Sequence, residues 1–301
     1  MSAPLPHGLS VAVATPMNAG GSLDLNGLVR HVEWLIEQGV DQLIPCGTTG
    51  ESATLDLDEQ RRVIAACVEV AKGRVPVYAG AGTNSTTRSR RLARAARDEG
   101  ADGLLLVTPY YNRPSQAGLE QHFREVIDAG VDLPVILYNV PGRTGVNLEP
   151  ETVLRLADLE PVVAVKEASG DLEQVMTLIR GRPEGFCVLS GDDSMALPII
   201  AMGGDGVISV AANEVPDRMR ALVYAALEQR MDEARDRHYE LLPLMRANFV
   251  ESNPVPVKTA LHLMGRMGAH VRGPLSALSS ASLEHLRKTL IDIGLIEVNT
   301  E

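Results

Sequence analysis

The placement of Lys166 is the strongest chemical signal in the sequence. Four apolar residues, 162–165, lead directly into this lysine, and a Ser-Gly pair follows at 169–170. This composition predicts a buried strand that is ended by a turn. Because side chains alternate along a strand, Val162, Ala164 and Lys166 should share one face.

A lysine at the end of a buried strand has two possible roles. A buried ammonium is costly unless it is paired, so Lys166 can pair with Glu167 or Asp192, or extend its amine to water. Alternatively, desolvation favours the neutral amine, which can attack a carbonyl carbon and form a Schiff base. This stretch by itself leaves both roles open.

Other stretches that follow apolar runs could bind or protonate a small acid. The turn Gly47-Thr48-Thr49-Gly50 offers two hydroxyls and exposed backbone N–H groups, which suit a carboxylate, although an ordinary turn fits equally. Tyr138 ends an apolar run, and its hydroxyl can carry protons. Arg143 lies in the loop that follows, where its guanidinium can bind a carboxylate or form a surface ion pair.

Further candidate positions lie at the remaining predicted strand ends. Tyr110 and Tyr111 are adjacent after the run 103–107, where they could also be packing anchors. Gly191 follows the run 186–189, and Ile208 lies in the run 206–209. The seven histidines are scattered, with no HxH or HExxH spacing. We therefore expect neither a metal site nor a Ser-His-Asp hydrolase.

The elements that must position these residues alternate between strand and helix. Strands are predicted at 9–15, 42–45, 75–79, 103–107, 134–138, 162–166, 186–189 and 206–209, and helices at 24–38, 56–71, 86–99, 116–129, 149–159, 172–180, 194–202 and 215–228. Continuously apolar strands that alternate with helices indicate a parallel sheet covered by helices. Eight such units fit a (β/α)8 TIM barrel of the α/β class, whose active site lies where the strands end.

The pattern changes to helix only after Gln229. Helices are predicted at 231–246, 256–265 and 282–293. Ser282 is the predicted N-cap of the last of these, and Asp56 is the predicted N-cap of the barrel helix at 56–71. We expect a barrel over 1–229 and a C-terminal helical domain over 230–301. An open doubly wound sheet is disfavoured because Gly80-Ala81-Gly82-Thr83-Asn84-Ser85 lacks the third glycine of a dinucleotide-binding fingerprint.

The composition excludes several classes of function. The net charge is −11, so nucleic-acid binding is not expected. No apolar run is long enough to span a membrane, and the first seven residues do not read as a signal peptide. Three cysteines without CxxC spacing suit a reducing compartment. We expect a cytoplasmic protein.

Together the motifs resemble a known family. They are Gly47-Thr48-Thr49-Gly50-Glu51-Ser52, Tyr110-Tyr111-Asn112-Arg113-Pro114-Ser115, Tyr138-Asn139-Val140-Pro141-Gly142-Arg143-Thr144-Gly145, Lys166-Glu167-Ala168, Ser190-Gly191-Asp192-Asp193 and Asn253-Pro254-Val255-Pro256-Val257-Lys258. This set is similar to the dihydrodipicolinate synthase family, within the pyruvate-dependent Schiff-base aldolases that include N-acetylneuraminate lyase. The resemblance implies a (β/α)8 barrel with C-terminal helices and a homotetramer built as a dimer of dimers.

The resemblance also implies a reaction and a role for each residue. Pyruvate would form an imine with the lysine and condense with L-aspartate 4-semialdehyde in lysine and diaminopimelate biosynthesis, without metal or cofactor. The implied catalytic residues are Lys166, Tyr138, Thr48 and, from a neighbouring subunit, Tyr111; the implied substrate-binding residues are Thr49, Arg143, Gly191 and Ile208.

Two alternatives stay open at this point. One is a related aldolase that acts on keto-deoxy sugar acids or sialic acid, against which Arg143 argues because it suits a carboxylate. The other is a non-catalytic keto-acid-binding barrel, which would not need the lysine. The resemblance further predicts weak or absent feedback inhibition by lysine. Inhibited members commonly carry a histidine where this chain has Leu57, a histidine or similar polar group where it has Gln60, and a glutamate where it has Arg88.

Overall fold

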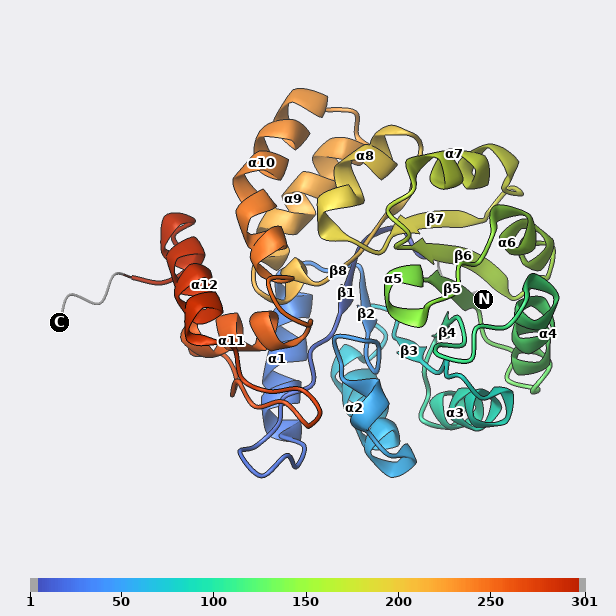
Figure 1. The fold of residues 1–301 in the computed structure, drawn as a ribbon, viewed down its shortest axis with the longest axis horizontal. Helices are drawn as coiled ribbons and strands as arrows, with labels where there is room; N and C mark the ends of the chain where they lie inside the picture. The colour runs from blue at the N-terminus through green and yellow to red at the C-terminus, as the bar shows by residue number, and fades with distance from the viewer. Residues whose placement is uncertain (1–4, 298–301) are drawn as a thin grey trace.

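The computed structural model describes residues 5–297, in which eight parallel strands alternate with helices (Figure 1). The strands are β1 (Gly8–Ala12), β2 (Gln42–Ile44), β3 (Tyr78–Gly80), β4 (Gly103–Val107), β5 (Val135–Asn139), β6 (Val162–Glu167), β7 (Cys187–Ser190) and β8 (Gly206–Ser209). Their order in the sheet is β2-β1-β8-β7-β6-β5-β4-β3. A parallel bridge between Leu43 and Val77 joins the two outermost strands, so the sheet closes into the predicted (β/α)8 barrel.

Helices follow the strands, as the sequence predicts. Those of the barrel are α1 (Leu25–Glu37), α2 (Leu57–Ala71), α3 (Thr86–Asp98), α4 (Gln116–Ile127), α5 (Pro141–Thr144), α6 (Pro150–Ala157), α7 (Leu172–Gly181), α8 (Ala196–Ala201) and α9 (Pro216–Leu227). Short 3-10 turns lie at Ser52–Thr54, Asp193–Met195 and Ala211–Asn213. The four-residue helix α5 is the one barrel helix that the sequence pattern missed.

The strands separate two apolar layers. Inside the barrel, one or two buried residues from each strand form a cluster that includes Ile44, Ile136, Ala164 and Ile208. The opposite faces of the strands pack against the surrounding helices in a larger cluster. Each fully buried Val, Leu or Ile side chain contributes about 1.5–3 kcal/mol, so both layers hold the strand ends in fixed positions.

The face assignment predicted for β6 is correct for two of its three residues. Ala164 belongs to the inner cluster, but Val162 belongs to the outer one. The reason is a bulge: Val135 pairs with Val162, whereas the next residue, Ile136, pairs with Ala164. One extra residue moves every side chain before it to the other face.

Side-chain caps explain where two helices begin. Asp56 accepts a hydrogen bond from the Glu59 N–H at 2.8 Å and donates its own N–H to the Glu59 carboxylate at 3.1 Å, which completes a capping box and confirms Asp56 as N-cap. The prediction of Ser282 as the N-cap of the last helix was wrong. Ser279 takes that position because its hydroxyl accepts from the Ser282 N–H.

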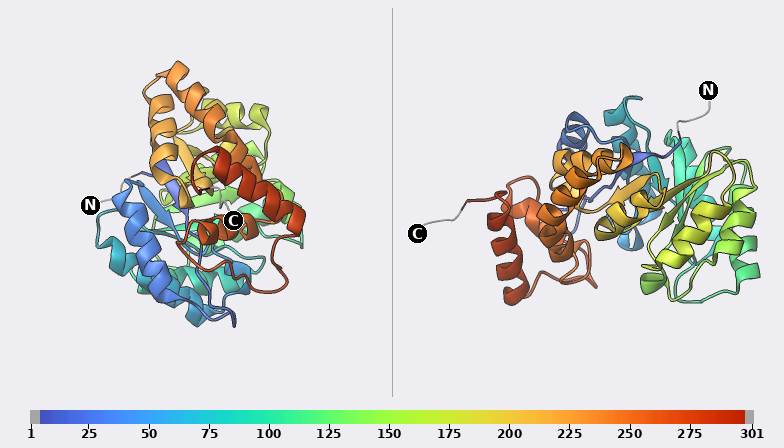
Figure 2. Two further views of the ribbon diagram at one scale, coloured as in Figure 1. Left: turned by 90° about the vertical axis from the view of Figure 1, so that its left-hand side faces the viewer. Right: turned by 90° about the horizontal axis from the view of Figure 1, so that it is seen from above.

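The last part of the chain is helical and lies at one side of the barrel (Figures 1 and 2). It comprises α10 (Met231–Ala247), α11 (Val255–Leu263) and α12 (Ser280–Asp292), of which α12 lies farthest from the sheet. Val257 and Leu261 of α11 pack on Ala14 and Val210, which follow β1 and β8. The division at 229/230 stays a prediction. Within residues 5–297 no helix is long and apolar enough to cross a membrane.

Candidate active site

Lys166 and Tyr138 face each other at the ends of two neighbouring strands. They are register partners in the β5–β6 pair, and both point into the barrel interior. Lys166 is 4% exposed and Tyr138 5% exposed. The Lys166 Nζ atom lies 4.3 Å from the centre of the Tyr138 ring, so the amine and the phenol are close enough to serve one ligand.

The two carboxylates proposed as ion-pair partners for Lys166 are engaged elsewhere. Glu167 points to the other face of β6, where it accepts from the amides of Asn139 and Gln174 and from the Ser169 N–H. Asp192 caps its own turn by accepting from the Ser194 N–H and hydroxyl. Over the described range 5–297, no carboxylate lies within 4 Å of the Lys166 amine.

Gly191 packs directly beside the Lys166 side chain. A Cβ atom at this position would lie 3.1 Å from the Cγ and Cε atoms of Lys166 and 2.8 Å from Ala168 Cβ. The predicted role of Gly191, to leave room next to the lysine, is compatible with this spacing.

The Thr48–Thr49 turn is tightly built. Cys46 and Glu51, on either side of it, have positive φ values of 56° each, and Gly80 lies so close to the Cys46 carbonyl that a Cβ atom would overlap it. Thr48 and Tyr138 line one cavity of about 30 Å³. Thr49 is 2% exposed, and its hydroxyl accepts a hydrogen bond from Asn253.

A larger cavity of about 330 Å³ adjoins the first, since Thr48, Ser52, Gly80, Gly82 and Val107 line both. Its wall also contains Arg143 and Tyr110. The volume is at the lower end of the range for small-molecule sites. A small acid held near Thr48 can therefore meet a guanidinium farther out in the same space.

Ile208 and Tyr111 are the remaining predicted site residues. Ile208 lies in β8, with its side chain in the same inner cluster as Tyr138. Tyr111 is 89% exposed, lines neither cavity, and has a positive φ of 75°. Its backbone N–H donates to the Thr144 carbonyl. The single chain thus does not bring Tyr111 to Lys166, and its contribution from a neighbouring subunit stays a prediction.

The loop after β8 is held by buried acids. Asp193 accepts from the Val210 and Ala211 N–H groups at 3.0 and 2.9 Å, and burial raises its pKa while the Ser209 hydroxyl and these N–H groups lower it. Burial also raises the pKa of Glu214 well above its ordinary value, against the effect of its hydrogen bond from Asn248. These contacts fix the backbone that follows Ile208.

Neither the metal-ligating side chains nor the cysteine thiols of residues 5–297 form a reactive site. Residues 5–297 contain no cluster of three or more metal-ligating side chains. All three cysteines are buried, and burial raises the pKa of Cys67 and of Cys187 to about 12, which makes them poor nucleophiles.

The sequence did not assign a role to Asn253, although it lies in one of the quoted motifs. Its side chain contacts Thr49 from 204 residues away along the chain and lines the larger cavity. The Asn-Pro pair at 253–254 indicates a turn, but no local pattern could reveal this partner.

Known proteins match almost the entire chain. Residues 5–293 match the Dihydrodipicolinate synthetase family. A relative named 4-hydroxy-tetrahydrodipicolinate synthase, from Methanoculleus marisnigri, is 49% identical over 291 residues, which cover 96% of this chain and 99% of the relative.

Two solved structures are similar in both fold and sequence. The chloride-inhibited dihydrodipicolinate synthase from Acinetobacter baumannii, complexed with pyruvate, has a TM-score of 0.94 and 44% identity, covering 96% of this chain and 99% of its own. A monomeric dihydrodipicolinate synthase variant has a TM-score of 0.94 and 42% identity, covering 96% and 97%.

Proposed function

Because this chain belongs to the dihydrodipicolinate synthetase family, we propose that it condenses pyruvate with L-aspartate 4-semialdehyde through an imine on Lys166. The enzyme is a lyase of the class I aldolase type, and its product feeds the biosynthesis of diaminopimelate and lysine. The observation that carries the assignment of Lys166 is its buried amine, which has no carboxylate partner within 4 Å in residues 5–297 and lies against Tyr138.

The reaction begins with a carbon–nitrogen bond. The Lys166 amine attacks the keto carbon of pyruvate, and loss of water gives the imine. Tyr138 moves the protons that this step requires, since its ring lies beside the amine. The imine withdraws electrons, so the adjacent methyl group loses a proton, and the imine becomes an enamine with a carbon–carbon double bond.

The second half of the reaction forms the ring. The enamine carbon adds to the aldehyde carbon of L-aspartate 4-semialdehyde, and the aldehyde oxygen takes a proton. The amino group of that substrate then attacks the imine carbon and displaces the Lys166 amine. The enzyme returns to its starting state, and no metal or organic cofactor enters the scheme.

The remaining candidates position the two acids. Thr49 and the backbone of Ile208 hold the pyruvate carboxylate, and Gly191 keeps space beside the lysine. Arg143 binds the carboxylate of the aldehyde substrate, which is supported by its place in the larger cavity with Thr48. This positive group favours the aldehyde over a neutral sugar chain.

Thr48 and Tyr111 extend the proton relay from Tyr138. Tyr111 serves the site of a neighbouring subunit, and we propose a homotetramer made of two dimers. Its 89% exposure in one chain supports this role, because a large exposed aromatic ring suits an interface. Three buried free thiols support a cytoplasmic location.

Chemical trapping tests the proposal. Pyruvate and borohydride should reduce the imine to a stable adduct that mass spectrometry locates on Lys166. Lys166→Ala should abolish the adduct and nearly all turnover while keeping the melting temperature. An adduct on Lys72 or Lys258 in place of Lys166 would overturn the assignment.

A further inference from the structure

Asn253 connects the C-terminal helices to the threonine turn of the active site. Its Nδ2 atom donates to Thr49 Oγ1 at 3.0 Å. Both side chains are buried, with 5% and 2% exposure. The contact is therefore shielded from bulk water and formed between fixed groups, which strengthens it relative to an exposed hydrogen bond.

This hydrogen bond restricts how Thr49 can be used. A threonine hydroxyl carries one proton and two acceptor lone pairs. Because Asn253 occupies a lone pair, the Thr49 proton must point in another direction, and no group in residues 5–297 accepts it. The proton is thus available to a ligand acceptor such as a carboxylate oxygen.

We propose that Asn253 is a positioning residue that sets the Thr49 hydroxyl as a hydrogen-bond donor to the pyruvate carboxylate. This inference rests on the proposed function, in which Thr49 holds that carboxylate. It makes the segment before α11 a determinant of pyruvate affinity, although it contributes none of the reacting atoms. Without Asn253, the hydroxyl could rotate and present a lone pair to the anion.

A buried ion pair keeps the two segments in place. Lys258 Nζ lies 2.6 Å from Glu51 Oε1, and the two side chains are 0% and 1% exposed. Glu51 comes two residues after Thr49, and Lys258 comes five residues after Asn253. The pair therefore joins the same two segments as the Asn253–Thr49 hydrogen bond, from the first turn of α11.

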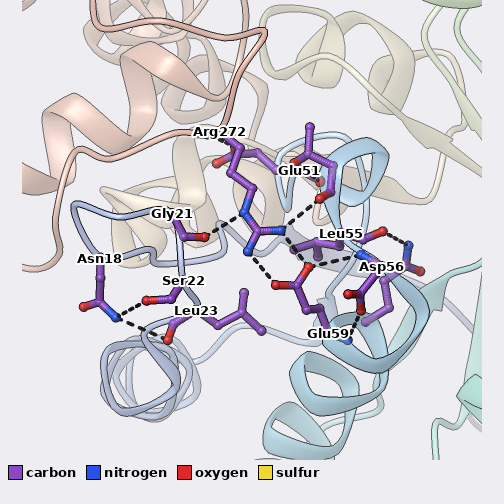
Figure 3. A network of polar contacts seen from close by, with 11 residues as sticks. Asn18, Gly21, Ser22, Leu23, Glu51, Leu55, Asp56, Glu59 and Arg272 are labelled. Atoms are coloured by element: carbon purple, nitrogen blue, oxygen red, sulfur yellow. Dashed lines mark hydrogen bonds and ion pairs between the residues drawn. The ribbon is translucent and has the colours of Figure 1, made fainter.

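Arg272 adds a third attachment to this part of the chain (Figure 3). The backbone N–H of Arg272 donates to Glu51 Oε2 at 3.0 Å. Its guanidinium donates to both carboxylate oxygens of Glu59 at 2.5 and 2.6 Å. Bidentate pairs of this kind fix direction as well as distance. Residues from beyond the barrel thus hold the chain at Thr49 and Glu51, in and beside the threonine turn, and at Glu59 in the first turn of α2.

The decisive variant is Asn253→Asp, which keeps the shape but replaces the donor with an acceptor. The new carboxylate would take the Thr49 proton and repel the pyruvate carboxylate. We expect the pyruvate concentration for half-maximal borohydride trapping on Lys166 to rise about 10-fold or more. The KM for the aldehyde substrate should change little.

The pH profile separates positioning from a general loss of structure. A buried aspartic acid that takes up a proton becomes a donor again. With cyanoborohydride as the reductant, because borohydride decomposes in acid, trapping by Asn253→Asp should recover toward the wild-type value as the pH is lowered to about 5, whereas damage to the fold would not recover. Asn253→Ala, which removes the donor without adding charge, should lose less than Asn253→Asp at neutral pH, and its loss should not change with pH.

A negative charge introduced at the neighbouring position 252 provides the matched control. Ser252 is exposed and lines the same cavity, so Ser252→Asp adds the same charge without touching Thr49. The pyruvate concentration for half-maximal trapping should rise much less in Ser252→Asp than in Asn253→Asp. Combining Asn253→Asp with Thr49→Val should add little to the effect of Thr49→Val alone.

The outcomes distinguish this inference from the proposed function. If the wild-type enzyme forms no adduct on Lys166, the proposed function fails. If the wild type is trapped but Asn253→Asp binds pyruvate with unchanged affinity, or if Ser252→Asp loses as much, the positioning role of Asn253 is refuted. If Asn253→Asp does not fold, the same comparison with Asn253→Ala decides.

Discussion

Gly191 offers a direct test of how closely the site is fitted to Lys166. In Gly191→Ala, the new methyl group would lie 3.1 Å from Lys166 Cε and 2.8 Å from Ala168 Cβ. Because apolar carbons pack at about 3.5–4.0 Å, Lys166 must move by roughly 0.4 Å and Ala168 by roughly 0.7 Å. The displaced Cε atom carries the amine that we propose attacks pyruvate.

The size of the effect follows from the cost of overpacking. Adding a carbon to a closely packed site costs about 1–3 kcal/mol. If this cost falls on the transition state for imine formation, the rate should drop by roughly 5- to 150-fold. If Lys166 and Ala168 stay in place, the same cost should appear as a lower melting temperature.

The assay measures the rate of borohydride trapping together with the melting temperature. Ala168→Gly in the same chain removes the shorter contact and should recover part of the loss, while the contact with Lys166 remains. Gly20→Ala is the control, since a Cβ there meets no atom within 4 Å and Gly20 does not have a positive φ. Wild-type trapping and wild-type melting in Gly191→Ala would refute the reasoning.

Three further predictions concern affinity, acid stability and regulation. Arg143→Ala should weaken binding of the aldehyde substrate by about 1.5–3 kcal/mol, or roughly 10- to 150-fold in KM, with pyruvate trapping much less affected; equal damage to both would make Arg143 structural. Burial lowers the pKa of His31 to about 4, although its hydrogen bond to Asn213 opposes this shift. Its stabilising contribution is therefore present above pH 6.5 and lost as the pH falls through 4. The free energy of unfolding should drop by about 3 kcal/mol more in the wild type than in His31→Gln between pH 7 and pH 4, and parallel curves would contradict this. Millimolar L-lysine should inhibit turnover weakly or not at all, because Arg88 lines the larger cavity and repels an ammonium; gain of inhibition in Arg88→Glu would support this cause, and strong wild-type inhibition would refute it.

The sequence predicts the fold well where the local pattern and the final contacts agree. The strands 103–107 and 206–209 have the predicted bounds, because each begins at a glycine that follows an aspartate and continues through β-compatible apolar residues. The third strand was predicted at 75–79 but spans Tyr78–Gly80. The Pro76 carbonyl accepts from the Leu43 N–H, so this part of the run still lies beside β2, outside the regular ladder.

Contacts between distant parts of the chain could not be predicted. The bulge in β6 depends on how β5 pairs with it, and a count of alternating residues in β6 alone places Val162 on the wrong face. Helix α5 has four residues, too few to show a helical period. The hydrogen bond from Asn253 to Thr49 requires the tertiary fold, because neither residue carries a local sign of the other.

The structure contains two buried lysines, and their surroundings explain why only one suits covalent chemistry. Lys258 is paired with Glu51, with 2.6 Å between Lys258 Nζ and Glu51 Oε1. Burial lowers its pKa, but Glu51 opposes that shift, and an ammonium held this way has no lone pair to donate. Lys166 is almost as buried, yet strand alternation points its neighbour Glu167 to the opposite face, where Asn139 and Gln174 bind it. Among residues 5–297 no carboxylate within 4 Å pairs with the Lys166 amine, which lies beside the Tyr138 ring, so Lys166 is the buried lysine that is placed to attack a carbonyl carbon.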